Sequence, residues 1–420
     1  MAPTPAEAKY EEWVKKCGGA RVIRRLLVAN NGMAAAKFIM SIRSFLFQNF
    51  GDDQLIHIIA MATPEDMKAS AKHLALANAY YEVPGGPNFN NYANVSVITT
   101  MAQLHSCDAV WPGWGHASEN PALPRTCEEL GIIFVGPTDR SMFLLGDKIA
   151  STIIAQSAEV PCVSWSGTGV TVEKSADGKI DVDDETFLKC CVTSAEEALS
   201  VAEKVGYPIM IKASEGGGGK GVRKALSGAD IPSMYQQVAD EVKGSPIFLM
   251  RLCNGARHVE IQVLADKHKN VAILSGRDCS MQRRFQKIVE EGPPIAVGPE
   301  TMKQMELAAA KLALMVDYTH AGTVEYLFIE ETGAFYFLEL NPRLQVEHPV
   351  TEGITGMNIP SLQLMVAMGV DITKVRARAH NGSLSSHNSQ PHTSPLVHTH
   401  TLPPFPFSSP LRSTARWIRQ

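Results

Sequence analysis

Short hydrophobic runs alternate with amphipathic segments through residues 22–135. The apolar run at 22–30 predicts a strand, and Asn31-Gly32 separates it from a helical run over 33–48. Similar pairs follow, with strands expected at 55–62, 108–111 and 132–135 and helices at 63–79, 95–105 and 125–130. Such alternation is typical of a parallel sheet covered by helices on both faces. Ligands of these sheets usually bind beyond the carboxyl ends of the strands.

Beyond residue 138 the pattern predicts more paired strands. One amphipathic helix is expected over 138–157, with Lys148 in its middle, and 167–192 is interpreted as a hairpin excursion or surface insert. A capping box that starts at Ser194 predicts a helix ending at Gly206. The remaining expectations are helices at 231–242, 301–316 and 359–368, strands at 207–212 and 247–251, and a hairpin formed by 257–264 and 271–276.

A polar stripe follows a predicted hairpin between Gly322 and Glu347. Two apolar runs flank a turn at 331–333, and alternate side chains of a strand share a face. That spacing predicts one polar face, whose members are Glu325, Leu327, Phe337, Glu339, Asn341, Arg343, Gln345 and Glu347. Carboxylate and amide oxygens are typical Mg²⁺ ligands, an arginine can clamp an anion, and a last carboxylate can serve as a base. The alternative is a half-solvated hairpin with a charged outer face.

Consecutive glycines at 216–219 follow the apolar strand that contains Lys212. Glycine lets backbone N–H groups approach phosphate oxygens closely. Lys212 and Lys220 bracket the glycines, which favours phosphate binding by a mobile loop over a floppy hairpin tip. The segment is not a Walker A loop, because Lys220 is followed by Gly221 and the flanks are predicted strands.

Two further polar segments each permit two interpretations. The loop 112–120 either lines a site at the edge of the parallel sheet or is an irregular connection between strand and helix. The segment 277–291, dense in Arg, Gln and Lys, is either a solvated surface or an anion-binding wall beside the phosphate site.

Bulk composition narrows the class of protein. The formal net charge of −4 gives no reason to expect nucleic acid or an anionic membrane as a partner, and no apolar run is long enough to span a bilayer. The eight cysteines show no CxxC spacing, so we expect reduced thiols in a cytoplasmic protein. The acidic, polar N-terminus resembles neither a signal peptide nor a transit peptide.

The composition changes sharply after Val375. Residues 376–420 contain no Asp or Glu but five His, six Pro and eight Ser. Such a segment buries too little apolar surface to offset its ordering entropy. We predict a disordered or non-native tail.

Together, the ordered motifs from about Gly18 to Val375 resemble the biotin carboxylase domain of eukaryotic-type acetyl-CoA carboxylase. They include LLVANNGMAAAK, VWPGWGHASENPALP, FVGPTDRSMFLLGDKIAST, IKASEGGGGKGVRK, GRDCSMQRRFQKIVEE and FYFLELNPRLQVEHPVTE. Bacterial-type relatives typically carry Arg-Gly-Glu where this chain has Asn-Gly-Met at 31–33, which favours the eukaryotic branch.

The resemblance implies an α/β ATP-grasp fold. Its parts would be a Rossmann-like pre-ATP-grasp domain (the biotin carboxylase N-terminal domain), a glycine-loop lid and an incomplete C-terminal α/β body. The corresponding boundaries are 1–137 for the N-terminal domain, 138–162 for a linker helix, 163–252 for the lid, 253–375 for the body and 376–420 for the tail.

The resemblance also implies roles for individual residues. ATP phosphates would be contacted by Lys148 and Lys212 and covered by Gly216, Gly217, Gly218 and Gly219. Other nucleotide-site positions are His258, Gln282 and, more loosely, Arg251 and Leu327. The metal ligands for Mg²⁺ or Mn²⁺ would be Glu325, Glu339 and Asn341. Bicarbonate would meet Lys287, Arg343 and the backbone of Gln345 and Val346, with Glu347 as the base.

The implied reaction is the ATP-dependent carboxylation of biotin, the first half-reaction on the way to malonyl-CoA and fatty acids. Bicarbonate would attack the γ-phosphate of ATP to give carboxyphosphate, whose CO₂ is captured by biotin. The chain carries no Met-Lys-Met biotinylation motif, so biotin would arrive on a carrier domain elsewhere. Expected partners are a carboxyltransferase region of a full-length parent and a second copy in a homodimer.

Two departures from the family keep alternatives open. Phe285 stands where the family usually has His, and the resemblance ends near Val375, where the family continues. The alternatives are an inactive truncated ATP-binding fragment and another ATP-grasp ligase, such as a carbamoyl-phosphate or amino-acid ligase.

Overall fold

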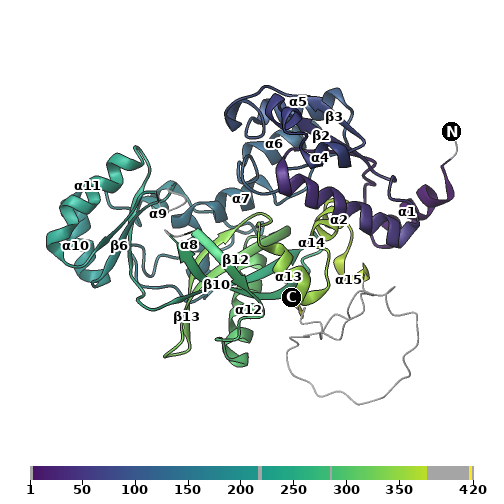
Figure 1. Ribbon diagram of the computed structural model, residues 1–420. Helices are drawn as coiled ribbons and strands as arrows, with labels where there is room; N and C mark the ends of the chain where they lie inside the picture. Colours follow the sequence, from purple (N-terminus) through teal and green to yellow (C-terminus); the bar gives the residue numbers. More distant parts are fainter. Residues whose placement is uncertain (1–2, 216–219, 284–285, 376–415, 419–420) are drawn as a thin grey trace, which may run out of the picture.

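The computed structural model describes residues 3–215, 220–283, 286–375 and 416–418 (Figure 1). Its strands form a parallel five-stranded sheet, a three-stranded antiparallel sheet and a larger antiparallel sheet. Within these residues, no helix combines the length and apolarity needed to cross a membrane.

The N-terminal unit is the parallel sheet that the alternating pattern predicts. It begins with helix α1 (Pro5–Lys16), and the strand order is β3-β2-β1-β4-β5. The strands are β1 (Arg25–Val28), β2 (His57–Ala62), β3 (Ala79–Glu82), β4 (Ala109–Trp111) and β5 (Ile133–Phe134). The helices among them are α2 (Gly32–Phe50), α3 (Pro64–Lys68), α4 (Lys72–Leu76), α5 (Val95–Leu104) and α6 (Ala122–Glu129), with a 3₁₀ turn η1 (Asn88–Asn90).

The prediction of a single helix over 63–79 is wrong for the second half of this range. Two short helices and β3 occupy this region instead. Ser70 between α3 and α4 has a φ of 50°, a left-handed conformation that ends a helix. The capping box of Thr63 and Asp66 fixes only the first turn.

The helix predicted over 138–157 is two helices, α7 (Asp139–Gly146) and α8 (Lys148–Ser157). Asp147 separates them, because its carboxylate accepts hydrogen bonds from the backbone N–H groups of Ile149 and Ala150 and so caps α8. Lys148 is therefore the first residue of a helix and not the middle of one.

The small antiparallel sheet, ordered β7-β6-β8, forms a separate layer with two covering helices. It contains β6 (Ile209–Ala213), β7 (Val222–Ala225) and β8 (Ile247–Arg251). The covering helices are α10 (Ala195–Val205) and α11 (Ile231–Glu241), preceded by α9 (Asp184–Leu188), and a 3₁₀ turn η2 (Gly228–Asp230) leads into α11. In Figure 1, α10 and α11 lie at the left, projecting from the rest of the molecule.

The body is an antiparallel sheet ordered β11-β10-β9-β12-β13. Its strands are β9 (Arg257–Ala265), β10 (Val271–Arg283), β11 (Gln286–Glu291), β12 (His320–Ile329) and β13 (Ala334–Asn341). Helix α12 (Pro299–Met315) covers its apolar face, where Val259, Val324 and Tyr326 are fully buried. Helices α13 (His348–Thr355), α14 (Ile359–Ala367) and α15 (Ile372–Val375) follow.

One hydrophobic cluster joins the N-terminal unit to the body. It includes α2, β1 and β4 together with α14. The rings of Phe38 and Trp111 stack at 3.9 Å within it, and Trp111 Nε1 donates to Gln363 on α14 at 3.4 Å. This packing fixes the carboxyl edge of the parallel sheet relative to the body.

Residues 416–418 correct the expectation of a wholly disordered tail. They form β14 (Arg416–Ile418), antiparallel to β10 at Val271–Ile273. β11 pairs only with the far half of β10, so this part of the strand offers free backbone groups to an additional strand. Residues 376–415 lie outside the described part of the chain.

Candidate active site

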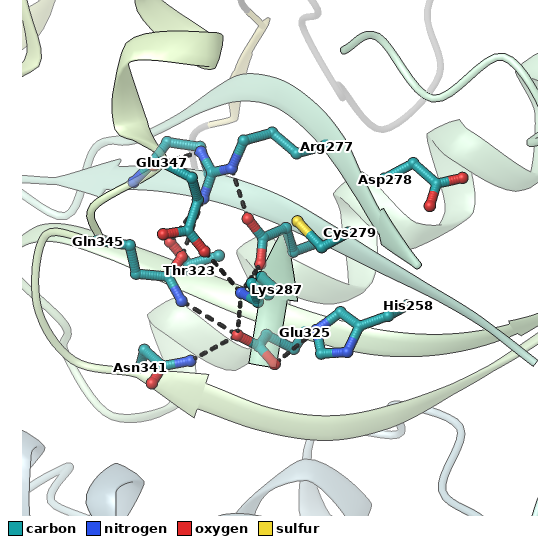
Figure 2. A network of polar contacts seen from close by, with 12 residues as sticks. His258, Arg277, Asp278, Cys279, Lys287, Thr323, Glu325, Asn341, Gln345 and Glu347 are labelled. Atoms are coloured by element: carbon teal, nitrogen blue, oxygen red, sulfur yellow. Dashed lines mark hydrogen bonds and ion pairs between the residues drawn. The ribbon is translucent and has the colours of Figure 1, made fainter. Parts of the chain in front are cut away.

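Five strands of the body, β9 to β13, place polar side chains in one cluster (Figure 2). Glu325 on β12 is opposite Glu260 on β9 and opposite Glu339 on β13. Arg277 on β10 is opposite Glu260. The polar face predicted for the hairpin therefore extends across the sheet, which contradicts the alternative of a half-solvated hairpin, because Glu325 and Glu260 are 3% and 0% exposed.

A bulge changes the predicted membership of this face. Glu325 pairs with Glu339, whereas Tyr326 pairs with Phe337, so Leu338 is an extra residue in β13. Phe337 consequently lies in the apolar core beside Tyr326, and its predicted place on the polar face is wrong. Beyond Asn341 the chain leaves the strand, and Arg343, Gln345 and Glu347 lie on the turn that leads to α13.

Lys287 is at the centre of the polar cluster. Its Nζ atom lies 2.6 Å from Glu260 Oε2, 2.9 Å from Glu325 Oε1 and 2.7 Å from Glu347 Oε1. Partial burial lowers the pKa of Lys287, but the charges of Glu325, Glu260 and Glu347 outweigh it and the net pKa is raised. The ammonium is therefore held protonated by three carboxylates.

Glu325 accepts contacts at both carboxylate oxygens. Its Oε1 accepts from Lys287, from Asn341 Nδ2 at 2.9 Å and from Gln345 Nε2 at 3.0 Å. Its Oε2 lies 2.7 Å from His258 Nε2. Burial raises the pKa of Glu325, but His258 and Lys287 dominate and the net pKa is lowered, so Glu325 stays ionised.

His258 and Gln282 join the same cluster. Burial lowers the pKa of His258, yet the hydrogen bond and charge of Glu325 raise it more, which leaves the net pKa raised. Gln282 Nε2 lies 3.1 Å from His258 Nδ1. The structure thus brings together seven residues from the sequence prediction: His258, Gln282, Lys287, Glu325, Asn341, Gln345 and Glu347.

Glu339 lies near Lys148 and Lys212, the two lysines predicted to contact ATP phosphates. Burial and the charge of Glu325 raise the pKa of Glu339, more than Lys148 and Lys212 lower it. Burial lowers the pKa of Lys212 to about 8, despite the opposing effect of Glu339. Lys148 Nζ donates to the carbonyl of Ser214 at 3.0 Å, which places the N-terminus of α8 against the end of β6. Two ammonium groups and a helix N-terminus are a suitable arrangement for anionic phosphates.

The loop 112–120 reaches this site. Arg343 Nε lies 2.9 Å from Glu119 Oε2, and Arg343 Nη2 donates to Asn341 Oδ1 at 3.2 Å. Asn30, two residues after the end of β1, holds the loop by donating to the carbonyls of Pro112 and Trp114. Of the two interpretations of this loop, the structure supports the one that places it at a site.

The other predicted residues have mixed outcomes. Arg251 ends β8 and is exposed on a different sheet from the cluster, Leu327 is opposite His258, and the Val346 side chain is 60% exposed. The glycines at 216–219 and Phe285 lie outside the described residues, so the phosphate loop stays a prediction. The described residues of the segment 277–291 belong to β10 and β11, and they supply Arg277, Gln282 and Lys287 to the cluster.

Sequence reasoning missed Glu260 and Arg277. A signal existed for Glu260, because β9 alternates His258, Glu260 and Gln262 with the buried apolar residues Val259 and Ile261. Arg277 gave no such signal, since it lies among several arginines in a segment that also suits a solvated surface.

The donor set suits a divalent cation. Glu325 and Glu339 are cross-strand neighbours, and Asn341 contacts Glu325. Burial, together with the charge of Glu325, raises the pKa of Glu339 more than the nearby lysines lower it. A cation beside these oxygens would relieve the repulsion between the two carboxylates. The ligand atoms of His258, Glu260 and Glu325 also lie within 4.8 Å of one another, but the ammonium of Lys287 already contacts both carboxylates of that group.

Comparisons with known proteins agree with this architecture. Residues 22–142 match the family model of the biotin carboxylase N-terminal domain, and residues 171–375 match that of the carbamoyl-phosphate synthase L chain ATP-binding domain. The chain is 54% identical over 369 residues to acetyl-CoA carboxylase of Dictyostelium discoideum and 52% identical over 375 residues to that of Saccharomyces cerevisiae. These matches cover 87% and 88% of this chain but only 16% and 17% of those relatives.

Solved structures give the same picture. A Campylobacter jejuni biotin carboxylase in complex with β,γ-ATP matches with a TM-score of 0.72 and 31% identity, covering 83% of this chain and 71% of that one. The biotin carboxylase domain dimer of Hydrogenobacter thermophilus 2-oxoglutarate carboxylase, in complex with MgADP, ADP and bicarbonate, matches with a TM-score of 0.72 and 33% identity. That match covers 83% of this chain and 70% of the other.

Proposed function

The chain belongs to the biotin carboxylase family and has its ATP-grasp fold, and from this premise we propose that it uses ATP and bicarbonate to carboxylate biotin. The observation that carries the proposal is the ammonium of Lys287 among Glu260, Glu325 and Glu347, next to Arg343. This arrangement combines a fixed cation, an anion clamp and a carboxylate base at one edge of the sheet. The high identity to eukaryotic acetyl-CoA carboxylases supports the reaction as the first half of acetyl-CoA carboxylation.

In the proposed reaction, Arg343 and Lys287 bind bicarbonate and Glu347 accepts its proton. Lys148 and Lys212 hold the ATP phosphates, and the bicarbonate oxygen attacks the γ-phosphorus to give carboxyphosphate and ADP. Carboxyphosphate breaks down to CO₂ and phosphate, the phosphate takes the N1 proton of biotin, and N1 attacks CO₂. The cations lower the cost of each anionic step because they are fixed before the reaction.

Glu325, Glu339 and Asn341 would hold the Mg²⁺ or Mn²⁺ that accompanies ATP. When bound, the metal would neutralise phosphate charge and orient the γ-phosphoryl group. The chain's own part is to keep Glu325 ionised, which its contacts with His258 and Lys287 favour.

Partners and setting belong to the same proposal. We infer that biotin is presented by a carrier domain, that carboxybiotin is consumed by a carboxyltransferase region of a larger protein, and that the chain pairs as a homodimer in the cytoplasm. The division at 137, 162, 252 and 375 remains our proposal for the domains.

The decisive experiment measures ADP release by the purified chain with Mg-ATP and bicarbonate, with and without free biotin. We expect biotin-stimulated release that Glu347→Gln abolishes and Glu331→Gln, an exposed residue of the hairpin turn, does not. ADP release that needs bicarbonate but ignores biotin would indicate another ATP-grasp ligase, an alternative that the carbamoyl-phosphate synthase match keeps in view. Nucleotide binding without release would indicate an ATP-binding fragment.

A further inference from the structure

Arg277 is a charged residue inside the sheet face that no substrate can reach. It is 0% exposed, and its side chain is enclosed by β9, β12, the turn before α13 and α13 itself. An arginine has five N–H donors. All five are used here, by Glu260 at 2.5 Å, Gln262 at 2.9 Å, Thr351 at 2.6 Å, Thr323 at 3.3 Å and Gln345 at 2.9 Å.

Two of these partners also contact members of the polar cluster around Lys287. One carboxylate oxygen of Glu260 accepts a hydrogen bond from Arg277 Nε, and the other accepts one from Lys287 Nζ. Gln345 accepts a hydrogen bond from Arg277 Nη2 at its Oε1, and its Nε2 donates to Glu325 Oε1. Figure 2 shows the guanidinium of Arg277 next to Glu347 and turned toward Gln345.

The orientation of the Gln345 amide depends on this contact. An amide can rotate to exchange its oxygen and its NH₂ group, and the hydrogen bonds around it decide which orientation is stable. The guanidinium has only N–H donors, so it stabilises only the amide orientation in which Oε1 faces Arg277. The NH₂ group is then left for Glu325. With the opposite orientation, an amide oxygen would face the Glu325 carboxylate and repel it.

Glu260 depends on Arg277 in a comparable way. It is fully buried, and a buried carboxylate needs charged and hydrogen-bonded partners on both oxygens. Arg277 satisfies Oε1, which leaves Oε2 directed at Lys287. A lysine at position 277 would keep the charge but offer only three donors without the fixed planar fork.

We propose that Arg277 is a positioning residue that fixes Gln345 and Glu260 in the orientations that face Glu325 and Lys287. This proposal rests on the proposed function only for its effect on turnover; its effect on Gln345 is independent of the reaction. Arg277 touches no reacting atom and acts through these two neighbours.

The experiment compares Arg277→Lys with Thr351→Val in the full chain. Thr351→Val removes another acceptor of the same guanidinium but leaves the contacts to Glu260 and Gln345. For Arg277→Lys we expect kcat to fall about 100-fold, as misplaced catalytic groups typically cause, with the KM for Mg-ATP within about threefold of the wild type. For Thr351→Val we expect both constants within about twofold. Equal losses of kcat in both variants would mean a merely structural role and would overturn the proposal.

A second readout follows Gln345 without turnover. In a chain labelled with ¹⁵N-glutamine, Gln345→Leu identifies the Gln345 side-chain resonances, and their hydrogen exchange is measured in each variant. We expect slow exchange in the wild type and in Thr351→Val, and exchange at least about tenfold faster in Arg277→Lys. Unchanged protection in Arg277→Lys would overturn the proposal. If the wild type releases no ADP but Gln345 responds as expected, the proposed function fails while the positioning role stands.

The charge-removing variant is tested as a pair, because Arg277→Met alone leaves Glu260 buried with less compensation. The double variant Arg277→Met/Glu260→Gln removes both charges of this pair. Neither partner is then left as an uncompensated buried charge that would destabilise the fold. It should still show fast exchange at Gln345, since the methionine gives Oε1 no donor. Slow exchange in a folded double variant would contradict the assigned role.

Discussion

The Nζ atom of Lys287 lies 2.7 Å from Oε1 of Glu347, although 60 positions separate the two residues in the sequence. The candidate base and a candidate bicarbonate ligand are therefore in direct contact with each other. Because Glu260 and Glu325 share the same ammonium, removing one charge from the cluster changes the environment of every other member.

Lys287→Met should be strongly destabilising. It leaves three carboxylates that are at most 4% exposed around a site that has lost its shared cation. Breaking a buried charge cluster in this way costs about 3 kcal/mol or more. Urea unfolding of Lys287→Met and of Lys267→Met, an exposed lysine in the β9–β10 turn, measures the difference. A loss below about 1 kcal/mol for Lys287→Met would contradict the central position given to this residue.

Glu119→Gln should raise the KM for bicarbonate with little effect on stability. Its ion pair with Arg343 is half-exposed on the glutamate side, with Glu119 at 42% and Arg343 at 21%, so the stability loss should stay below about 1 kcal/mol. Arg343 would lose the contact that orients it for an anion, and we expect a KM increase of about fivefold or more. Asp139→Asn, which breaks the surface pair with Arg125, is the control and should leave the KM unchanged.

Lys212 should change its reactivity near pH 8. Burial lowers its pKa to about 8, so it is protonated and unreactive below that pH and becomes a free amine above it. Competitive acetylation at a series of pH values, read by mass spectrometry and normalised to exposed Lys267, reports this change. Mg-ATP should move the midpoint upward, because phosphates favour the charged form. A midpoint above about 10 without ATP would mean that Lys212 is not desolvated.

Acid should destabilise the fold through His320. Burial, with a smaller effect of Lys267, lowers the pKa of His320 to about 3, whereas an unfolded histidine titrates near 6.5. The unfolded state therefore binds a proton that the folded state excludes, and stability falls as the pH drops from about 6.5 toward 3. At pH 5 the loss from this residue is about 2 kcal/mol.

His320→Asn tests this contribution while keeping a residue that tolerates the left-handed φ of 72° at this position. Urea unfolding at pH 7 and pH 5 should show a smaller acid loss in the variant than in the wild type, by about 2 kcal/mol. Equal acid losses in the two proteins would exclude His320 as a source of the pH dependence.

A local pattern predicted the parallel sheet, and the two-residue spacing of the hairpin predicted part of the polar cluster. The family resemblance, and not a local pattern, supplied His258, Gln282 and Lys287. Strand and helix alternate visibly from 22 to 135, and the carboxylates follow a recognisable two-residue spacing in the hairpin. The errors arise where a single residue changes the local geometry. Asp147 divides a continuous amphipathic pattern into two helices by capping the second one, and Leu338 inserts into β13 without disturbing its apolar character.

Arg277 and Glu260 show a different limit. Their roles depend on partners such as Thr351 and Gln345, which lie 74 and 68 positions from Arg277. The spacing of residues within one strand does not reveal a contact with a residue so far away in the sequence. The β9–β10 register, which places Arg277 opposite Glu260, emerges only when the sheet is assembled.

The extra residue at Leu338 also bears on how β13 tolerates change in length. On its N-terminal side the strand sends Phe337 into the core, and on its C-terminal side it sends Glu339 toward Glu325. Deleting Leu338 would make Phe337 and Glu339 adjacent, which would restore a regular ladder and keep both side chains on their present faces, because adjacent side chains of a strand point to opposite faces. The bulge is thus a position at which β13 can lose one residue and still keep Phe337 in the core and Glu339 opposite Glu325.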